Sequence, residues 1–300
     1  MFEMLRAGVV GLGKKGFLCD LDEPVRSPES HVGAYVKSDH YNLVAVCDRD
    51  EEKIKLFEEK YPNIPAYTDL QEMLYESKIQ VLSVVTPVDT HCEIVRLAAR
   101  YHPIAAIFCE KPIASTLIEA KRMIRTCKNF GVGLAINHQR RWDSRWIEAK
   151  SMVEHIKPLR RAVGYCSGDL LEAGIHMMDL FRWMAPGVPY TYIDLKGEKP
   201  YKPYLFFEVE IFGEKGMIRI KENGDCIERY LSRPSRRRRY KGLNELEESG
   251  VIFPPPGCPM LAALENIAGF VRDKRPLACT GEDGLEALRM VLEEERKVSV

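Results

Sequence analysis

The run Leu5-Arg6-Ala7-Gly8-Val9-Val10 and the hexapeptide Gly11-Leu12-Gly13-Lys14-Lys15-Gly16 that follows it decide the fold class of this chain. The run is mainly apolar, as a buried strand is, and the hexapeptide matches the pattern G-x-G-x-x-G. In that pattern the first glycine makes a tight turn, the second lets the backbone approach a pyrophosphate, and the third lets a helix pack on the strand. We therefore expect a dinucleotide site whose phosphate-binding residues are Gly11, Gly13, Lys14, Lys15 and Gly16.

Four further apolar runs follow, and helical patterns separate them. The runs are Leu43–Cys47, Val81–Val85, Ile104–Cys109 and Val132–Ile136. Apolar residues at three- and four-residue spacing predict helices over Ser30–Lys37, Asp50–Tyr61, Thr90–Tyr101 and Thr116–Phe130. This alternation builds a parallel sheet covered on both faces. We predict an α/β dinucleotide-binding domain over residues 1–137.

The alternation ends after Asn137, and residues 138–300 are expected to form a second, α+β domain, with the alternative that its C-terminal helix packs back on the first domain. Helical patterns lie near Asp143–Glu154 and Gly174–Met184, and strand-like alternation follows in Glu208–Ile211 and Ile218–Lys221. Charged residues alternate with apolar ones there, which indicates a mostly antiparallel sheet with one buried face. Because it contains several prolines and glycines, Ser232–Cys258 is expected to be a long loop. The predicted closing helices are Met260–Arg272 and Gly284–Arg296.

Composition excludes several classes of protein. The 300 residues carry 44 Lys and Arg against 44 Asp and Glu, so no net charge attracts the chain to nucleic acid or an anionic membrane. No uncharged stretch is long enough to span a membrane, and the N-terminus lacks the features of a signal peptide. The nine cysteines include no C-x-x-C pair, which favours reduced thiols over disulfides or a metal site. A cytoplasmic location is expected.

The end of the second predicted strand bears on which dinucleotide binds. Asp48 would accept hydrogen bonds from the adenosine ribose and repel a 2′-phosphate, which favours NAD over NADP. Arg49 follows it and offers a charge for such a phosphate, so NADP stays possible. Asp48 also lies farther from the glycines than is usual, and a surface insertion over Asp20–Glu29 would account for the excess.

Two turns are expected to face the nucleotide, because open parallel sheets bind ligands at the carboxyl ends of their strands. Thr86-Pro87 follows the third predicted strand, and Glu110-Lys111-Pro112 follows the fourth. His91 lies in the helix after the first turn and is assigned to the same cofactor site. A lysine held in such a turn can bind a substrate hydroxyl or carbonyl, so Lys111 is a catalytic candidate rather than an ordinary surface lysine.

A second group of chemically active residues lies in the second half. In the segment Gly168–Asp179, a helix starting near Ala173 would place Glu172, His176 and Asp179 on one face. A carboxylate beside an imidazole fixes its tautomer and suits acid–base chemistry near neutral pH. The alternative is a histidine that only anchors a buried helix.

Taken in order, these motifs resemble the Gfo/Idh/MocA family of nicotinamide-dependent oxidoreductases. The resemblance rests on the glycine motif, on LVAVCD at the second strand, and on TP, CEKPIA and NHQRRW after the next three strands. It continues through GDLLEAGIHMMDLFRWM to residue 184, and DGLEALRMVL near the end also fits.

The resemblance implies a Rossmann domain followed by an α+β domain with an open sheet, and a homodimer or homotetramer. By it, Lys111 contacts the reacting hydroxyl and His176 is the acid–base catalyst or proton relay. Glu172 stands where many members have aspartate, so its catalytic role is the least secure. The substrate-binding residues implied are Asn137, His138, Arg141 and Asp179.

The expected function is NAD(P)-dependent oxidation of a secondary alcohol in a sugar, nucleotide sugar or cyclitol. Two alternatives stay open: a glycosidase or epimerase that retains NAD with no net redox change, and a non-catalytic nucleotide-binding regulator. The segment between Arg141 and Glu172 is short for the family, which suits a bulky substrate such as a nucleotide-activated sugar. Arg236–Arg239 and Tyr240 would then offer contacts to a diphosphate, although a solvated or disordered loop is the favoured interpretation of the run.

Overall fold

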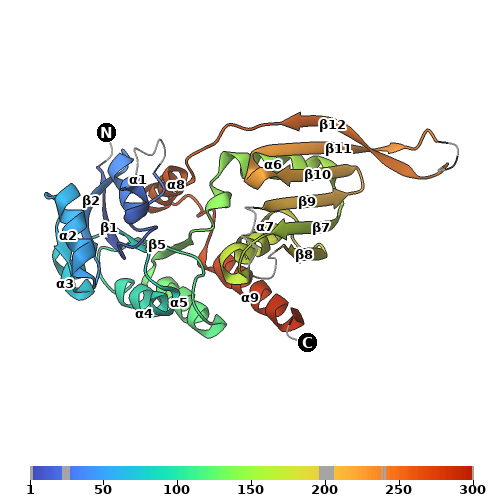
Figure 1. The fold of residues 1–300 in the computed structure, drawn as a ribbon. Coiled ribbons are helices and arrows are strands. Elements are labelled where there is room, and N and C mark those ends of the chain that lie inside the picture. Colours follow the sequence, from blue (N-terminus) through green and yellow to red (C-terminus); the bar gives the residue numbers. More distant parts are fainter. Residues whose placement is uncertain (1–2, 22–27, 196–205, 238, 240, 299–300) are drawn as a thin grey trace, which may run out of the picture. The chain divides into compact units, whose positions relative to one another are not determined.

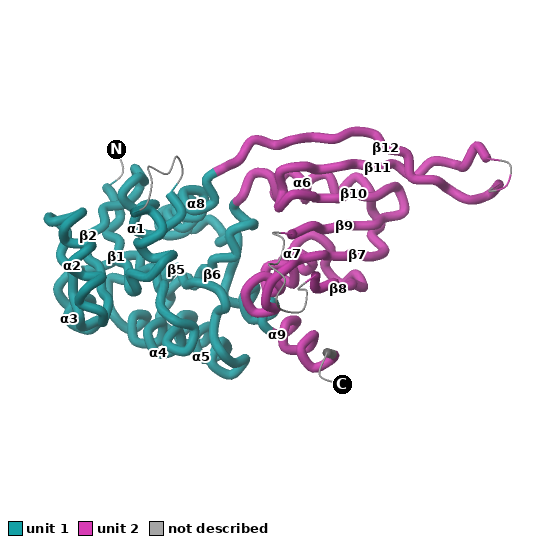
Figure 2. Tube along the Cα trace, in the orientation of Figure 1, with its two compact units in different colours: residues 1–142, 258–288 teal, residues 143–257, 289–300 magenta. Residues whose placement is uncertain are grey.

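The structure is a computed structural model that describes residues 3–21, 28–195, 206–237, 239 and 241–298. The chain forms two compact units (Figure 2). Unit 1 contains residues 1–142 and 258–288, and unit 2 contains residues 143–257 and 289–300. Residues 258–288, which the sequence pattern assigned to the second domain, therefore belong to the first unit.

Unit 1 is built on a six-stranded parallel sheet of order β3-β2-β1-β4-β5-β6 (Figure 1). This order is that of a Rossmann dinucleotide-binding fold and confirms the predicted fold class. The strands are β1 Leu5–Val10, β2 Tyr41–Cys47, β3 Ala66–Tyr67, β4 Val81–Val84, β5 Ala106–Cys109 and β6 Gly133–Ile136. The helices between them are α1 His31–Lys37, α2 Glu51–Lys60, α3 Leu70–Glu76, α4 Val88–Ala98 and α5 Leu117–Phe130. Every residue of β4, β5 and β6 is buried, as expected of strands covered on both faces.

The C-terminal part of the chain completes unit 1. Helix α8, Pro259–Asp273, is held by Tyr41, whose hydroxyl donates to the Leu264 carbonyl at 2.8 Å, and by Arg272, which donates to the His40 carbonyl at 3.2 Å. Helix α9, Gly281–Val298, begins in unit 1 and ends in unit 2. The hydrogen bonds of α8 span more than two hundred positions of sequence, so local patterns predicted this helix but not the unit to which it belongs.

Unit 2 contains the second six-stranded sheet, of order β12-β11-β10-β9-β7-β8. All neighbouring pairs are antiparallel except β7 and β8, so the prediction of a mostly antiparallel sheet is confirmed. The strands are β7 Leu159–Cys166, β8 Tyr190–Asp194, β9 Phe207–Gly213, β10 Gly216–Lys221, β11 Cys226–Pro234 and β12 Asn244–Ile252. The helical elements are α6 Ser144–Val153, a π-helical turn η4 Leu170–Gly174 and α7 Ile175–Met184.

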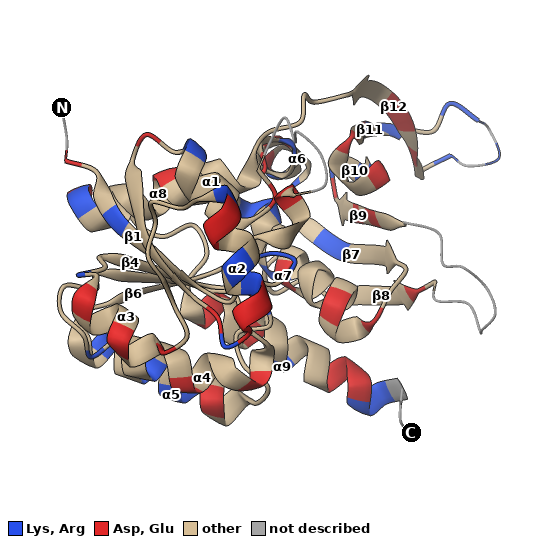
Figure 3. Cartoon of the chain, turned by 60° about the vertical axis from the view of Figure 1, so that its left-hand side comes forward, with Lys and Arg blue, Asp and Glu red and all other residues tan. Residues whose placement is uncertain are grey.

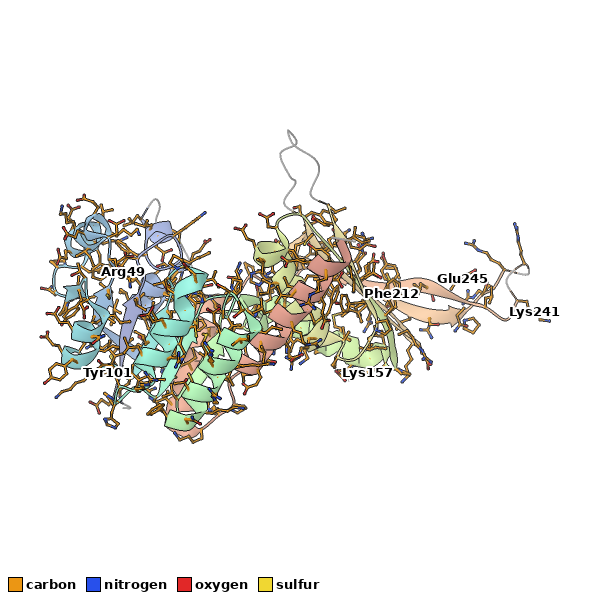
Figure 4. The ribbon with its side chains drawn as sticks, turned by 90° about the horizontal axis from the view of Figure 1, so that it is seen from below. Arg49, Tyr101, Lys157, Phe212, Lys241 and Glu245 are labelled. Carbon is orange, nitrogen blue, oxygen red and sulfur yellow. The ribbon has the colours of Figure 1, made fainter. Side chains whose placement is uncertain are left out.

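The predicted loop over Ser232–Cys258 is wrong, because most of it is a β-hairpin. Strands β11 and β12 pair as far as Pro234 and Asn244, beyond the end of β10, and Figure 4 shows Glu245 and Lys241 lying beyond Phe212 of β9. Strand β12 is an edge strand without a buried face, so its sequence lacks the apolar alternation that marks a strand. Charged cross-strand contacts support it instead, as between Arg233 and Glu247 at 3.8 Å.

All nine cysteines are free thiols, and seven of them are buried. Among the described residues, no helix combines the length and apolarity needed to cross a membrane.

Candidate functional site

The glycine loop follows β1 directly and has the backbone that its sequence requires. Gly11 has φ +96°, and a side chain on it would collide with the carbonyl of Val85. A side chain on Gly16 would collide with the Gly11 carbonyl, whereas nothing lies within 4 Å of the position that a Cβ on Gly13 would occupy. The loop thus packs closely at its two ends and is open at its centre, which fits a bound pyrophosphate.

The helix that begins at this loop is interrupted and then resumes. A helical turn follows Gly13, whose carbonyl accepts from Phe17 at 2.9 Å. The N–H of His31 donates to the Lys15 carbonyl and that of Val32 to the Gly16 carbonyl, both at 3.0 Å, so α1 continues that turn across the intervening residues. The predicted insertion over Asp20–Glu29 agrees with this excursion, although residues 22–27 lie outside the described residues.

Asp20 joins the two ends of the segment that separates this helical turn from α1. Its carboxylate accepts from the Ser30 hydroxyl at 2.5 Å and from the backbone N–H of Glu29 at 3.0 Å. Although burial raises the pKa of Asp20, these hydrogen bonds lower it below its usual range. Lys15 contributes a longer ion pair to Glu29, at 3.5 Å.

A pocket of about 630 Å³ lies beside the glycine loop in unit 1. Its lining includes Gly13, Asp48, Arg49, Asp69, Gln71 and Thr86. The Asp48 carboxylate accepts from the N–H of Leu12 at 2.7 Å and of Asp50 at 3.0 Å, so it also fixes the loop. Arg49 lines the pocket and is exposed; Figure 4 labels its side chain. The open glycine, the pocket and the acidic residue at the end of β2 fit the adenosine half of a dinucleotide.

The turns after β4 and β5 are tied together by His91, which is 1% exposed. Its Nε2 lies 2.8 Å from the Thr86 carbonyl, and its Nδ1 lies 3.0 Å from the Pro112 carbonyl. Both predicted turns therefore meet at this histidine, which braces them through its two ring nitrogens. Thr86 and Thr90 share a hydrogen bond of 2.7 Å at the start of α4.

Glu110 is the most strongly connected side chain of the second turn. Its Oε1 lies 3.0 Å from Nε2 of His31 and accepts from Nδ2 of Asn137 at 2.7 Å, and its Oε2 accepts from the backbone N–H of Lys111 at 3.2 Å. Burial raises the pKa of Glu110, but the hydrogen bond and charge of His31 and the Asn137 amide outweigh it and lower the pKa to about 2. The carboxylate is ionised at neutral pH and fixes the backbone that carries Lys111, whose side chain is partly exposed.

The three residues assigned to the substrate after β6 are all buried, but they differ in their contacts. Asn137 bonds to Glu110, as described, and His138 is 1% exposed. Arg141 pairs with Asp283 of α9 at 3.2 Å and donates to the Ala278 carbonyl at 3.2 Å. These contacts within unit 1 favour a structural role for Arg141.

The residues assigned to chemistry in unit 2 follow one another along η4 and α7. Glu172 is exposed in the π-helical turn, His176 is partly exposed in the first turn of α7, and Asp179 is 1% exposed. The N–H groups of Glu172, Ala173 and Gly174 all lie within 3.3 Å of the Asp169 carbonyl. The helix therefore begins before Ala173, with a π-turn of the kind often found at functional sites.

The basic run lies at the tip of the β11–β12 hairpin, where Figure 3 shows Lys and Arg on the loop. Arg237 pairs with Glu245 at 3.5 Å, and both side chains are exposed. Arg238 and Tyr240, which were part of the prediction, lie outside the described residues.

Sequence reasoning missed two parts of the site in unit 1. One is the wall of the pocket formed by Thr68–Gln71 with Lys53 and Glu93, because the short strand β3 carries no periodic signal. The other is His31, which contacts Glu110 79 positions away in the sequence, with Ser83, which contacts His31 52 positions away. Only the fold brings those side chains together.

Comparisons with known proteins agree with this geometry. Residues 5–138 match the family model Gfo/Idh/MocA, described as "Oxidoreductase family, NAD-binding Rossmann fold". A D-apiose dehydrogenase of Rhizobium rhizogenes is 31% identical over 112 residues, which cover 37% of this chain and 32% of that protein. This chain thus matches about a third of the length of that relative. A myo-inositol 2-dehydrogenase of Thermotoga maritima is 28% identical over 99% of this chain and 98% of its own length.

The fold of the whole chain is also found among solved structures. The WlbA dehydrogenase of Bordetella pertussis, crystallised with NADH and UDP-GlcNAcA, superposes with a TM-score of 0.77 at 17% identity, over 99% of this chain and 97% of that one. The glycine loop, the adenosine pocket and the family model together identify NAD as the cofactor of unit 1. Residues 5–138 therefore match the Gfo/Idh/MocA family of oxidoreductases, and the whole chain has the fold of a solved dehydrogenase.

Proposed function

We propose that this protein is an NAD-dependent dehydrogenase that oxidises a secondary alcohol of a sugar, nucleotide sugar or cyclitol, or reduces the corresponding ketone. The observation that carries the proposal is the fixed position of Lys111. It follows β5 at the carboxyl edge of the Rossmann sheet, and an ionised glutamate with three hydrogen-bonding partners holds its backbone. A lysine whose backbone is fixed at that edge suits a reacting oxygen better than a solvated surface role.

Bound NAD would supply the hydride acceptor. Lys111 would donate a hydrogen bond to the substrate oxygen and stabilise negative charge as the hydroxyl proton leaves. His176 would take that proton, since a neutral imidazole can accept one near neutral pH. Asp179, three residues later in the sequence of α7, has the spacing to stabilise the imidazolium that results, and we assign Glu172 only a secondary, electrostatic role.

The substrate class is inferred from chemistry and relatives together. D-apiose, myo-inositol and UDP-GlcNAcA, named for the similar proteins, all carry secondary hydroxyls on a ring or short carbon chain. Lys111 and His176 require no more than such a hydroxyl. We extend this class to the present chain and propose a homodimer or homotetramer as the working form.

The test is to mix the purified protein with NAD or NADP and a panel of free sugars, inositols, glycosides and nucleotide sugars, and to follow the absorbance of reduced nicotinamide. We expect a rise with NAD and one class of polyhydroxylated substrate. If no compound gives a signal while NAD still binds, the dehydrogenase proposal fails. Product formed with no accumulation of reduced cofactor would instead identify a NAD-retaining enzyme.

A further inference from the structure

A buried chain of hydrogen bonds runs through unit 1 from α1 to the end of β6. The Tyr35 hydroxyl lies 2.9 Å from the Ser83 hydroxyl, and Ser83 lies 2.9 Å from Nδ1 of His31. His31 continues the chain to Glu110, which binds the Asn137 amide. Tyr35, Ser83 and His31 are each at most 1% exposed, so water does not compete for these bonds.

Counting donors fixes one hydrogen bond of the chain at neutral pH. An ionised Glu110 only accepts hydrogen bonds, so Nε2 of His31 must carry a proton and donate it. The Ser83 hydroxyl can accept or donate, so it pairs with Nδ1 of His31 whether or not that nitrogen carries a proton.

Asn137 has one buried polar atom for which this count finds no hydrogen-bond partner. The residue is 6% exposed, and its Nδ2 donates to Glu110 at 2.7 Å and contacts the sulfur of Met260 at 3.6 Å. Its buried Oδ1 has no hydrogen-bond partner among the described residues. Buried polar oxygens are rarely left unpaired, so this one calls for a partner that the protein itself does not supply.

Flipping the Asn137 amide does not supply the missing partner. A flipped Asn137 would place Oδ1 against the Glu110 carboxylate, and two acceptors repel each other. Glu110 therefore determines which way the amide faces, and His31 holds Glu110 in place.

We propose that His31 is a positioning residue: through Glu110 it orients the Asn137 amide so that Oδ1 accepts a hydrogen bond from an N–H or O–H donor of the bound ligand. Asn137 directly follows β6 at the carboxyl edge, next to Glu110 and Lys111, where this fold binds ligands. Two sources supply such a donor: the carboxamide of NAD and the hydroxyl of an alcohol substrate. The inference depends on the NAD site of unit 1 and not on the proposed reaction.

The first experiment measures how tightly three ligands bind to the purified full-length protein at equilibrium. They are NAD, its 3-acetylpyridine analogue and ADP-ribose. The analogue has a methyl ketone and no N–H donor, and ADP-ribose lacks the nicotinamide. If the carboxamide is the donor, the unaltered protein binds NAD roughly tenfold more tightly than the analogue. Asn137→Ala then removes this preference and leaves ADP-ribose affinity unchanged. The comparison of ligands on the unaltered protein stands even if the variant fails to fold.

A different set of results is expected if the substrate hydroxyl is the donor. If the donor is the alcohol, Asn137→Ala leaves the ratio of NAD to analogue affinity unchanged and raises KM for the alcohol about tenfold, with a smaller change in kcat. If neither the ratio nor KM changes in a folded Asn137→Ala protein, the inference is overturned. If the unaltered protein oxidises no alcohol but the affinity ratios of NAD and its analogue are as expected, the proposed function is rejected and the inference about Asn137 stands.

The role of His31 is tested by comparing a substitution that keeps an N–H donor with one that removes it. His31→Gln keeps an N–H donor that can reach Glu110, and we expect it to retain the preference that depends on Asn137. His31→Leu lacks the donor and should lose that preference. Tyr35→Phe is the matched control, because it keeps the contact between Ser83 and His31, and it should behave as the unaltered protein. A folded His31→Leu protein that keeps the full preference would contradict the positioning role.

Discussion

At the scale of single residues, Lys111 carries the proposed chemistry and gives the first prediction. Lys111→Met should lower kcat about 10²- to 10⁴-fold, because the substrate oxygen loses its cationic partner. NAD affinity should change only a few-fold, since the Glu110 carboxylate binds the backbone N–H at position 111 rather than the side chain. The check is steady-state kinetics together with calorimetric NAD binding.

The matched control is Lys121→Met, an exposed lysine on the outer face of α5. It should leave both kcat and NAD affinity unchanged. Equal turnover of the Lys111→Met and Lys121→Met variants would refute the catalytic assignment.

The second residue-scale prediction concerns Glu110 and acid. Its pKa is lowered from an ordinary 4.5 to about 2, so the folded state gains stability from the ionised group above pH 4.5 and loses it as the pH falls toward 2. The full contribution is on the order of 3 kcal/mol in the free energy of unfolding. Glu110→Gln should be less stable than the unaltered protein at pH 7, and the two should converge as the pH approaches 2.

Urea titrations at several pH values between roughly 2 and 7, which include the range in which a depressed carboxyl loses its stabilising effect, measure this difference. A difference between the two proteins that stays constant with pH would show that the buried network does not depend on the charge of Glu110.

At the scale of elements, the start of α9 shows how unit 1 secures its C-terminal segment. Arg141 and Asp283 have side chains that are 5% and 17% exposed, and Asp283 also accepts from the Thr280 hydroxyl at 2.9 Å. Arg141→Leu would leave that carboxylate poorly solvated and without its cation. We expect a loss of about 3 kcal/mol in the free energy of unfolding, measured by urea titration.

Helices α5 and α9 supply an exposed pair for comparison. Lys128 and Glu282 lie 2.6 Å apart and are 69% and 46% exposed, so Lys128→Met should cost less than about 1 kcal/mol. If the two variants lose similar stability, the buried pair does not anchor α9, and Arg141 would be free for the substrate role first assigned to it.

The elements also show where sequence reasoning succeeds and fails. Strand β1 has the predicted limits, because its residues are apolar and a glycine turn ends it. Strand β12 was missed, because it pairs with β11 through its backbone and has no buried face to give its sequence an apolar alternation. The glycine loop and Lys111 could be found from local motifs, whereas His31 could not, because its partner Glu110 lies 79 positions away.

At the scale of the whole molecule, unit 1 depends on two distant segments of chain. Residues 1–142 form the Rossmann sheet, but α8 from residues 258–288 packs on it through Leu264 and Arg272. A fragment of residues 1–142 should therefore fail to fold, because it would expose the apolar surface that α8 covers. Joining residues 1–142 to 258–288 with a short Gly/Ser linker should restore both cooperative unfolding and NAD binding.

Circular dichroism melts and NAD titrations of the two fragments are the measurement. A fragment of residues 1–142 that melts cooperatively and binds NAD as the full chain does would show that the C-terminal segment is dispensable to unit 1.

The measurement that tests the central claim most directly is the appearance of reduced nicotinamide when the unaltered protein and Lys111→Met, matched for bound NAD, meet the panel of carbohydrate alcohols. The account predicts absorbance with the unaltered protein and one substrate class, and almost none with the variant. Equal signals from both proteins, or silence from a protein that is saturated with NAD, would contradict it.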